Sequence, residues 1–554
     1  MSKTAHKHTI AAFKDFIPRW LRITIFITFA FIFQFSNTAY LSLTGTITGA
    51  DQILKEDLNF LFQMTAVGIC FIYPLLFRFK LRFTSRQIII GSSLTIIAMM
   101  GLILLTDWIS LLAVASFLLG SAKMLGTFEA LVSIQLIITP NKDYGVFFSV
   151  ALGIVLLSGQ VSGIWATFLN YDFDWRVIYK IMLAANALMI LLAQLLLQPI
   201  RVAKKLPLYG IDWMGYILWG CFFTSLTYFF CYGQVLDWFH SEMIQLSVVL
   251  SVFFGILTFW RMFSVKRPYL KPRIFTIGTV NISIVIMLLM QPFLSASGSV
   301  MGPFTAGVLR LDDLHNGALN WWIALGIATG SLFCYYWFLK IEGSFKLFFV
   351  ISFASITLYY GLLYFDLSTY ADSDVINFPY FLRGFANILL FVGVGKYITR
   401  NVGLDIFTQV LCYLAMARNS LGSLIPTSLI GYAEYWRTSD FNNKLSSKID
   451  TLNVSASMFY QSAYKKAITT GNDTNDAAIQ AGKQIFLKVN QQSVLLAGRE
   501  IFGLMTILGI FVIAILLTVH FGRPFISKIP SWYKLRSVLS PNNIKQRSFN
   551  DIEK

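Results

Sequence analysis

Apolar runs of about twenty residues recur along the whole chain, and they restrict its fold more than any other feature. Such a run crosses a hydrocarbon core of about 30 Å as a helix. Only helices and closed barrels satisfy every backbone group inside a bilayer, and these runs do not alternate like barrel strands. Charged residues make up 13% of the chain, against about 25% in soluble domains. We therefore expect an all-α polytopic membrane protein.

The apolar runs predict about fourteen membrane-spanning helices. Their expected ranges are Trp20–Leu43, Asn59–Phe77, Gln87–Leu105, Leu111–Ile138, Tyr144–Leu169, Val177–Leu197, Met214–Tyr232, Ile244–Phe263, Ile274–Leu294, Trp321–Leu339, Leu347–Leu363, Tyr380–Val394, Phe407–Ile430 and Ile501–Val519. One long hydrophilic insertion runs from about Tyr432 to Arg499. Its helix-permissive composition and the Gly471-Asn472-Asp473 break predict a helical hairpin.

The basic residues collect in alternate loops, which predicts the orientation of the chain. Basic clusters occupy Arg78 to Arg86, Arg201 to Lys205, Arg261 to Arg273 and the tail from Arg523, whereas the intervening loops are acidic. Since cytoplasmic loops are enriched in Lys and Arg, we expect a multi-pass protein of the inner (plasma) membrane with both termini in the cytoplasm. The net charge of +17 then reflects topology, and we expect no nucleic-acid partner.

No motif in the sequence indicates an enzyme. The cysteines lie within apolar runs without CxxC spacing, the histidines lack metal-ligand spacing, and no GxxxxGK[ST] string is present. We therefore expect free thiols, no metal, no cofactor and no catalytic activity. Transport by this chain would draw on an ion gradient or on the gradient of the substrate itself.

Several short strings support a family resemblance. They are Asn37-Thr38-Ala39-Tyr40-Leu41, Asp174-Trp175-Arg176, Ile211-Asp212-Trp213-Met214-Gly215, Lys266-Arg267-Pro268-Tyr269-Leu270 and Arg418-Asn419-Ser420-Leu421-Gly422-Ser423. With the layout of six helices, an inserted pair and six more, they resemble the major facilitator superfamily, in its fourteen-helix drug:proton antiporter branch of EmrB/QacA type. The segment Phe77 to Arg86 keeps the arginines of that family's gating motif but lacks its Gly and Asp.

The resemblance implies a major facilitator fold, with two six-helix bundles and an inserted helix pair. The implied divisions are a cytoplasmic N-terminus (1–19), an N-terminal bundle (20–198), a basic linker with the extra pair (199–272), a C-terminal bundle (273–520) that includes a long periplasmic loop (432–499), and a basic tail (521–554). The implied function is secondary active export of amphipathic organic compounds by proton antiport and alternating access. The implied partners of the periplasmic loop are a membrane-fusion adaptor and an outer-membrane channel.

Ionisable residues inside the predicted helices are candidate functional residues, because an intramembrane charge costs about 2.5–3.5 kcal/mol on insertion scales. Glu129 is the candidate proton-coupling residue, since desolvation favours the protonated form of a carboxylate. The alternative is a structural carboxylate paired with Lys123 or another buried base. Lys123 lies six residues earlier, about 240° around the helix, so we expect it to find a different partner.

Further polar residues are candidates for lining a substrate cavity, where the basic ones would favour anionic or carboxylate-bearing substrates. These candidates are Gln34, Asn37, Lys123, Arg383, Arg418 and Asn419; the basic ones have a packing role as the alternative. Gly159, Gln160 and Gly163 resemble the family's antiporter motif in the fifth helix, where small residues suit a sliding interface between the bundles or plain helix packing.

Two other functions stay open at this point. One is an importer or facilitator of an organic anion with the same fold. The other is a membrane scaffold or sensor that acts through the periplasmic loop. In the preferred hypothesis the chain binds a small amphipathic substrate and protons within the lipid bilayer.

Overall fold

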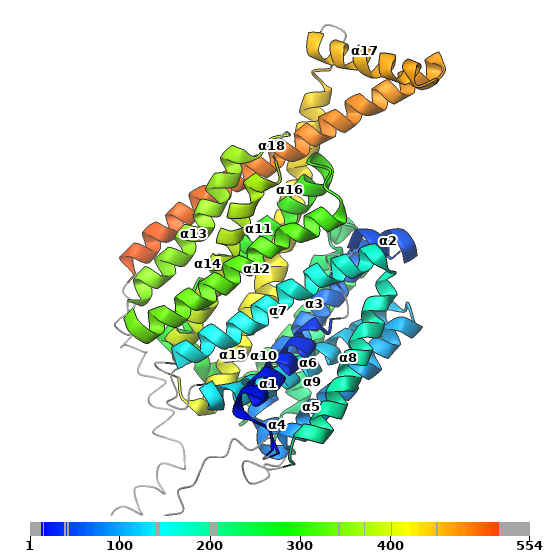
Figure 1. Cartoon of the computed structure of the whole chain (residues 1–554). Helices are drawn as coiled ribbons and strands as arrows, with labels where there is room; N and C mark the ends of the chain where they lie inside the picture. Colours follow the sequence, from blue (N-terminus) through cyan, green and yellow to red (C-terminus); the bar gives the residue numbers. More distant parts are fainter. Residues whose placement is uncertain are drawn as a thin grey trace, which may run out of the picture.

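The computed structural model describes residues 13–14, 16–37, 40, 44–51, 53–138, 144–199, 208–341, 344–369, 372–399, 402–449 and 453–519. Part of the Asn37–Leu41 string, the basic cluster Arg201 to Lys205 and the basic tail lie outside the described residues. The described part of the chain is almost entirely helical, and most of its helices run side by side in one bundle (Figure 1).

The long helices are α1 (Arg19–Phe35), α3 (Lys55–Ile72), α5 (Ser85–Leu105), α6 (Ile109–Ile138), α7 (Tyr144–Asp172), α8 (Trp175–Leu196), α9 (Trp213–Tyr232), α10 (Glu242–Ser264), α11 (Gly278–Pro303), α12 (Asp313–Tyr336), α13 (Phe345–Asp366), α14 (Asp374–Ile398), α15 (Leu404–Asn419), α16 (Leu421–Ser446), α17 (Val454–Thr469) and α18 (Thr474–Thr518). Shorter elements are α2 (Thr44–Asp51), α4 (Leu76–Arg82), and the turns η2 (Tyr73–Leu75), η3 (Trp238–His240), η4 (Pro272–Thr276), η5 (Phe304–Val308) and η6 (Trp337–Ile341).

Twelve helices of the described residues are long and apolar enough to cross a membrane. The prediction of an all-α polytopic fold is therefore confirmed. The apolar part of α1, Trp20–Phe35, is shorter than those twelve. The predicted helix Phe407–Ile430 is split at Ser420 into α15 and α16. The count of fourteen spans thus stays a prediction.

Several helices begin at polar residues that cap their first turn. The Thr84 side chain accepts from the amide of Gln87 at the start of α5, and the Gln87 side chain accepts from the amide of Thr84. Asp312 and Asn453 cap α12 and α17 in the same way, each accepting from an amide three residues on. These side chains satisfy amides that have no partner within the helix, so the helix starts are fixed locally.

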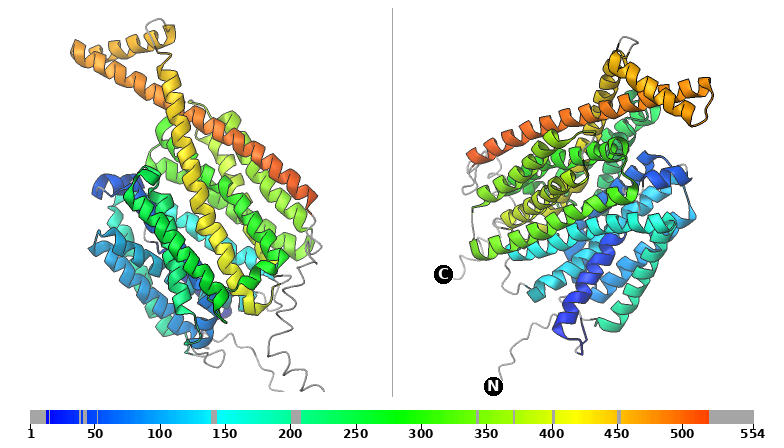
Figure 2. Two further views of the ribbon diagram at one scale, coloured as in Figure 1. Left: turned by 180° about the vertical axis from the view of Figure 1, so that it is seen from behind. Right: turned by 45° about the horizontal axis from the view of Figure 1, so that its top comes forward.

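The first and second halves of the chain repeat one packing pattern. In the first half, α6 packs on α3 and α5, and α5 packs on α8. In the second half, α14 packs on α12 and α13, and α13 packs on α18. Figure 2 shows the blue-to-cyan helices of the first half gathered apart from the green-to-red helices α11 to α18 of the second, with the green pair α9 and α10 beside the first half. The bundle therefore consists of two halves whose helices correspond.

Glycines set the closest contact in each half, and they do so at corresponding places. A Cβ on Gly120 of α6 would lie 2.1 Å from the Thr65 carbonyl oxygen of α3. A Cβ on Gly384 of α14 would lie 2.2 Å from the Ile323 carbonyl oxygen of α12. Gly68 and Gly326 make the reciprocal contacts, each with a Cβ position 2.1 Å from a carbonyl oxygen. Only glycine permits such backbone contact.

The two halves meet along α7 and α12 and, separately, through α3 and α15. Ser331 Oγ of α12 donates to the Ser149 carbonyl oxygen of α7 at 2.7 Å. Cys412 Sγ of α15 donates to the Cys70 carbonyl oxygen of α3 at 3.1 Å. Below, "α4 end" means the end of the bundle where α4 lies, and "hairpin end" means the opposite end, where α17 lies (Figure 1).

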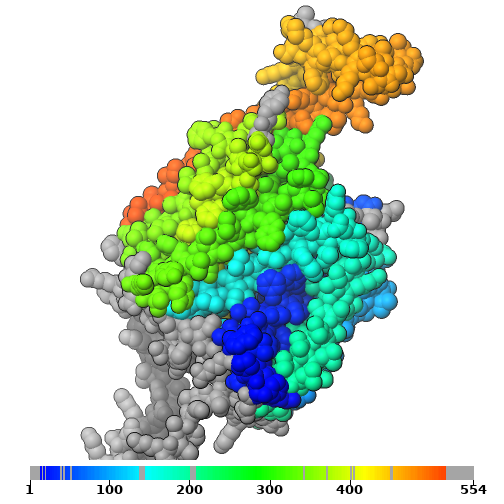
Figure 3. Space-filling model, viewed as in Figure 1, coloured from blue at the N-terminus to red at the C-terminus, as the bar shows by residue number. Residues whose placement is uncertain are grey.

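The hydrophilic insertion forms the predicted helical hairpin. It stands out beyond the bundle in Figure 3 and consists of the outer part of α16, α17 and the first part of α18. Gly471, with φ of +90°, allows the turn between α17 and α18.

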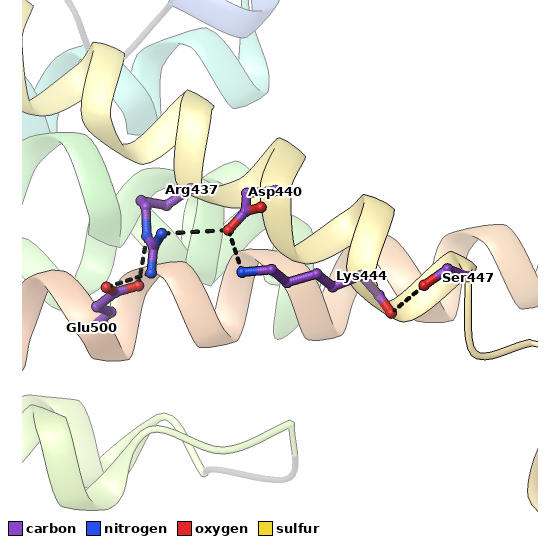
Figure 4. Close-up of polar contacts among 5 residues, drawn as sticks. All are labelled: Arg437, Asp440, Lys444, Ser447 and Glu500. Atoms are coloured by element: carbon purple, nitrogen blue, oxygen red, sulfur yellow. Dashed lines mark hydrogen bonds and ion pairs between the residues drawn. The ribbon is translucent and has the colours of Figure 1, made fainter.

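Where α16 and α18 leave the bundle, charged side chains join them (Figure 4). Arg437 binds both carboxylate oxygens of Glu500, at 2.7 and 2.5 Å. Asp440 accepts from Arg437 at 3.3 Å and from Lys444 at 2.8 Å. The base of the hairpin is thus fixed by a charge network.

The inserted pair, α9 and α10, begins with the Asp-Trp-Met-Gly string, and the structure shows why those residue types occur there. The Asp212 carboxylate accepts from the Gly215 amide at 3.0 Å and from Arg261 of α10 at 2.9 and 2.7 Å. A Cβ at Gly215 would lie 2.3 Å from this carboxylate. Burial raises the pKa of Asp212, but hydrogen bonds from Arg261, Gly215 and Tyr269 outweigh burial and hold that pKa below its usual value.

Candidate functional site

Lys123 is a buried lysine of α6 whose amine donates to uncharged oxygen atoms at the end of α1 and just after it. Its Nζ donates to Asn37 Oδ1 at 2.6 Å and to the Gln34 carbonyl oxygen at 2.9 Å. Gln34 Nε2 donates in turn to Thr127 Oγ1 at 3.0 Å. No carboxylate of the described residues pairs with this ammonium group. The structure therefore brings together three predicted cavity residues, with the Lys123 amine at the centre and no carboxylate partner among the described residues.

A glycine of α6 lets α1 reach Lys123. A Cβ on Gly126 would lie 2.3 Å from the Phe33 ring of α1, which is itself fully buried. Any larger residue at this position would force the Phe33 ring to shift. This close contact between α1 and α6 lies three residues from Lys123 along α6.

Glu129 forms an ion pair with Lys80 of α4, and not with Lys123. Glu129 is buried, with an exposed fraction of 1%, and Lys80 is largely buried, with 12% exposed. Lys80 Nζ also lies 3.4 Å from Ser85 Oγ, whereas Glu129 Oε2 has no hydrogen-bond partner. Of the two hypotheses for Glu129, the structure contains the contact that the second requires, a pair with another buried base. The pair connects the basic segment after α3 to α6.

Arg418 and Asn419 lie at the break between α15 and α16. Ser420 separates the two helices with φ and ψ of −105° and −100°, and its buried Oγ has no hydrogen-bond partner. The sharp junction requires glycine at 422, because a Cβ there would lie 1.7 Å from the Ala417 carbonyl oxygen. Interrupted helices leave unpaired backbone groups at membrane depth, where transporters use them to bind substrates and ions.

The guanidinium of Arg418 stacks on an aromatic ring and faces the other half of the chain. It lies 4.0 Å from the centroid of the Phe391 ring of α14, in a cation–π contact. Tyr73 and Cys70 of the first half lie near it. No carboxylate of the described residues pairs with Arg418. This cation therefore lies where the two halves meet.

Arg383 of α14 is a third cation without an acidic partner among the described residues. Three tyrosines lie near it: Tyr359 and Tyr360 of α13, and Tyr380 of its own helix. The Tyr359 hydroxyl lies 2.5 Å from Ser297 Oγ of α11. Arg383 is thus placed among polar hydroxyl groups in the second half of the chain.

The small residues predicted to bring helices together in the fifth helix do not do so in this conformation. A Cβ on Gly159 or Gly163 would meet no atom within 4 Å. The halves instead approach at Gly153 and Gly317, where an added Cβ would lie 2.5 Å from Ser331 and 2.9 Å from Thr167. The antiporter role of Gly159, Gln160 and Gly163 stays a prediction.

Two residues that shape the site were not singled out from the sequence. Lys80 counts only as one of several loop cations there, and nothing in the sequence links it to Glu129, 49 residues away. The helix break at Ser420 leaves the apolar run intact, so hydropathy does not detect it. The Gly422 that follows is the one sequence signal of the break.

Comparison with known proteins gives partial matches. No family model matches the chain. An uncharacterised MFS-type transporter of Bacillus subtilis, YcnB, is 25% identical over 147 residues, which are 26% of this chain and 30% of that protein. The matched segment thus spans about a third of that curated relative.

Two solved structures align over most of the chain, at low similarity. The human organic anion transporter MFSD10 (TETRAN) aligns with 89% of this chain and all of its own, at 10% identity and a TM-score of 0.49. A double Trp mutant of XylE aligns with 91% of this chain and 97% of its own, at 11% identity and a TM-score of 0.47. The chain's own geometry therefore has to carry the functional argument.

Proposed function

We propose that this chain is a secondary transporter of the major facilitator type that moves amphipathic organic anions by alternating access. The observation that carries the substrate class is a set of three cations, Lys123, Arg383 and Arg418, none of which has a carboxylate partner among the described residues. Charges at membrane depth are retained where a substrate or ion path needs them. An anionic substrate would supply the missing negative charge.

The repeated packing of the two halves supports the alternating-access part of the proposal. Transporters built from structural repeats bind substrate between the repeats and rock one against the other. Here Arg418 lies beside that junction, and the Cys412–Cys70 contact closes it toward the α4 end. We take the α4 end as cytoplasmic, because basic residues follow α3 and α10 there. The partial match to an MFS-type transporter agrees with this proposal.

The Lys80–Glu129 pair offers a means of proton coupling. In the conformation described, the pair holds α4 against α6. Protonation of Glu129 would remove its charge and release Lys80, so that the cytoplasmic end opens and the anion is exchanged. In this scheme protons act on the Lys80–Glu129 ion pair, which serves as a latch on the cytoplasmic end, whereas the substrate binds at the basic residues described above.

Transport in proteoliposomes tests the substrate class. We expect the wild type to move members of a panel of amphipathic anions, and Lys123→Met and Arg418→Met to move them at least tenfold more slowly, as loss of one charged contact of about 1.5–3 kcal/mol implies. Lys180→Gln is the matched control, because Lys180 is exposed on α8. Selective transport of cations by the wild type would contradict the anion proposal.

The ion pair of Glu129 also favours a second candidate, a facilitator without proton coupling, in which the pair only holds α4 against α6. Substrate-evoked proton flux separates the two candidates. Flux that is lost in Glu129→Gln but kept in Glu242→Gln, a change at an exposed glutamate, supports antiport. Anion transport without any proton flux supports the facilitator.

The hairpin favours a protein partner outside the bundle. Its described surface exposes large apolar side chains, with exposed fractions of 64% for Val454, 67% for Met458, 70% for Ile479 and 60% for Phe486. We propose this hairpin as the contact for a periplasmic adaptor. Deletion of Thr438–Gln491 would abolish efflux if the adaptor is needed for export, whereas unchanged accumulation of test compounds with lost partner binding would indicate a scaffold.

A further inference from the structure

A pocket of about 660 Å³ opens at the α4 end between three parts of the chain. Its lining comes from the segment around α4, from the loops that flank α9 and α10, and from α15. None of Lys123, Arg383 and Arg418 lines it. The volume is within the range of small-ligand sites, about 300–1,000 Å³.

The pocket carries an excess of positive charge. Arg78, Arg267 and Lys271 line it, and Asp212 is its single acidic lining residue. Asp212 is already engaged by Arg261, which binds it at 2.9 and 2.7 Å, and by the amides of Gly215 and Tyr269. No carboxylate of the described residues therefore neutralises the three lining cations, and the pocket is built to accept an anion.

The surroundings place this pocket at the membrane surface. Trp213 follows Asp212 in the chain and Trp260 precedes Arg261, and their exposed fractions are 43% and 67%. Exposed tryptophans of membrane helices are typical of the lipid–water interface. Phe77 and Leu81 add apolar lining beside the cations. A basic rim and an apolar wall at this depth match an amphiphile with a negatively charged head.

We propose that this pocket binds the phosphate headgroup of an anionic phospholipid. Basic pockets between membrane helices on the cytoplasmic side bind such headgroups. A soluble phosphate compound would offer the same phosphate group to the basic residues. The apolar wall and the flanking tryptophans favour a lipid, because only the lipid also carries acyl chains.

The bound headgroup would connect both halves of the chain. Arg78 belongs to the first half, and Gln409 of α15 lines the pocket from the second half while it accepts from the Lys271 amide at 3.3 Å. A phosphate between these groups would hold the α4 end closed. The lipid would therefore stabilise the conformation described here.

The test uses thermal unfolding of the full-length protein in detergent, followed by tryptophan fluorescence. Dihexanoyl-phosphatidylglycerol, dihexanoyl-phosphatidylcholine and glycerol 3-phosphate are titrated in parallel. The site variant is Arg267→Gln with Lys271→Gln. The matched control is Lys266→Gln with Arg273→Gln, which removes two exposed charges from the same loop without touching the pocket lining.

We expect phosphatidylglycerol to raise the melting temperature of the wild type and the control, with phosphatidylcholine and glycerol 3-phosphate inert. In the site variant the apparent affinity for phosphatidylglycerol should fall about thirtyfold, which corresponds to about 1 kcal/mol for each basic side chain. An equal response of site variant and control would overturn the site. A full response to glycerol 3-phosphate would overturn the lipid assignment.

If the site variant proves too unstable for melting curves, native mass spectrometry of Arg267→Gln replaces them. Loss of the retained phosphatidylglycerol, compared with Lys266→Gln, supports the proposal. Equal retention by the two variants overturns it.

Discussion

Breaking the Lys80–Glu129 pair should open the α4 end of the protein. Glu129→Gln leaves the Lys80 charge without its partner in a position that is only 12% exposed. Removing one member of a buried pair costs about 3–5 kcal/mol, and because Lys80 retains some exposure we take the lower value. At about 1.4 kcal/mol for each factor of ten, the ratio of the closed to the open population should fall about a hundredfold.

A native thiol reports on this change. Cys412 is fully buried where it contacts the Cys70 carbonyl oxygen of the other half. In a background whose remaining cysteines are alanine, we expect maleimide labelling of Cys412 to be about a hundredfold faster in Glu129→Gln, if labelling follows the open population.

Two further variants make the labelling experiment decisive. Adding Lys80→Met to Glu129→Gln should restore slow labelling, because no unpaired charge remains. Glu242→Gln should label as slowly as the parent. An unchanged labelling rate in Glu129→Gln, or the same increase in Glu242→Gln, would refute the latch.

Three other outcomes follow from the structure. Gly384→Val should abolish the monodisperse peak in fluorescence-detected size exclusion, because its Cβ would lie 2.2 Å from the Ile323 carbonyl oxygen, whereas Gly101→Ala, with nothing within 4 Å, should not. Arg437→Met should destabilise the base of the hairpin by about 1 kcal/mol, since the Arg437–Glu500 pair is partly exposed; faster limited proteolysis of the hairpin than in Lys448→Gln would show this, and equal rates would contradict it. The folded state holds the pKa of Asp212 below its usual value, so the ionised Asp212 carboxylate stabilises the fold above about pH 4, and this stabilisation is lost as the pH falls through the lowered pKa. The melting temperatures of wild type and Asp212→Asn should therefore converge at low pH. A difference that stays constant with pH would contradict this account.

The helices could be predicted from the sequence because their signal is local. The expected helix Ile244–Phe263, for example, lies inside α10, Glu242–Ser264. The Asp-Trp-Met-Gly string could be read as a helix start for the same reason, since Asp212 and Gly215 interact within one turn. Apolar periodicity and helix capping depend on residues that are close in the sequence, so neither requires knowledge of how distant helices pack.

The contacts of the candidate site could not be predicted, because they depend on how distant helices face each other. Helical spacing shows that Lys123 and Glu129 point in different directions, but it does not reveal that α1 holds the first and α4 the second. Gly159 and Gly163 look like contact glycines, yet the halves approach at Gly153 and Gly317. The position of the neighbouring helix decides which glycines it contacts, and the sequence around the glycines does not show that position.

The hairpin and the membrane bundle share continuous helices, and this gives the molecule a mechanical linkage. α18 runs unbroken from Thr474 in the hairpin to Thr518, 45 residues that make a rod of about 68 Å. α16 runs from the hairpin down to Leu421, the first residue after the break that follows Arg418 and Asn419. A force on the hairpin would therefore be transmitted along α18 to the second half of the chain and along α16 to the helix break that follows Arg418. Movement of the hairpin and movement at the α15–α16 break would therefore be coupled through these two helices.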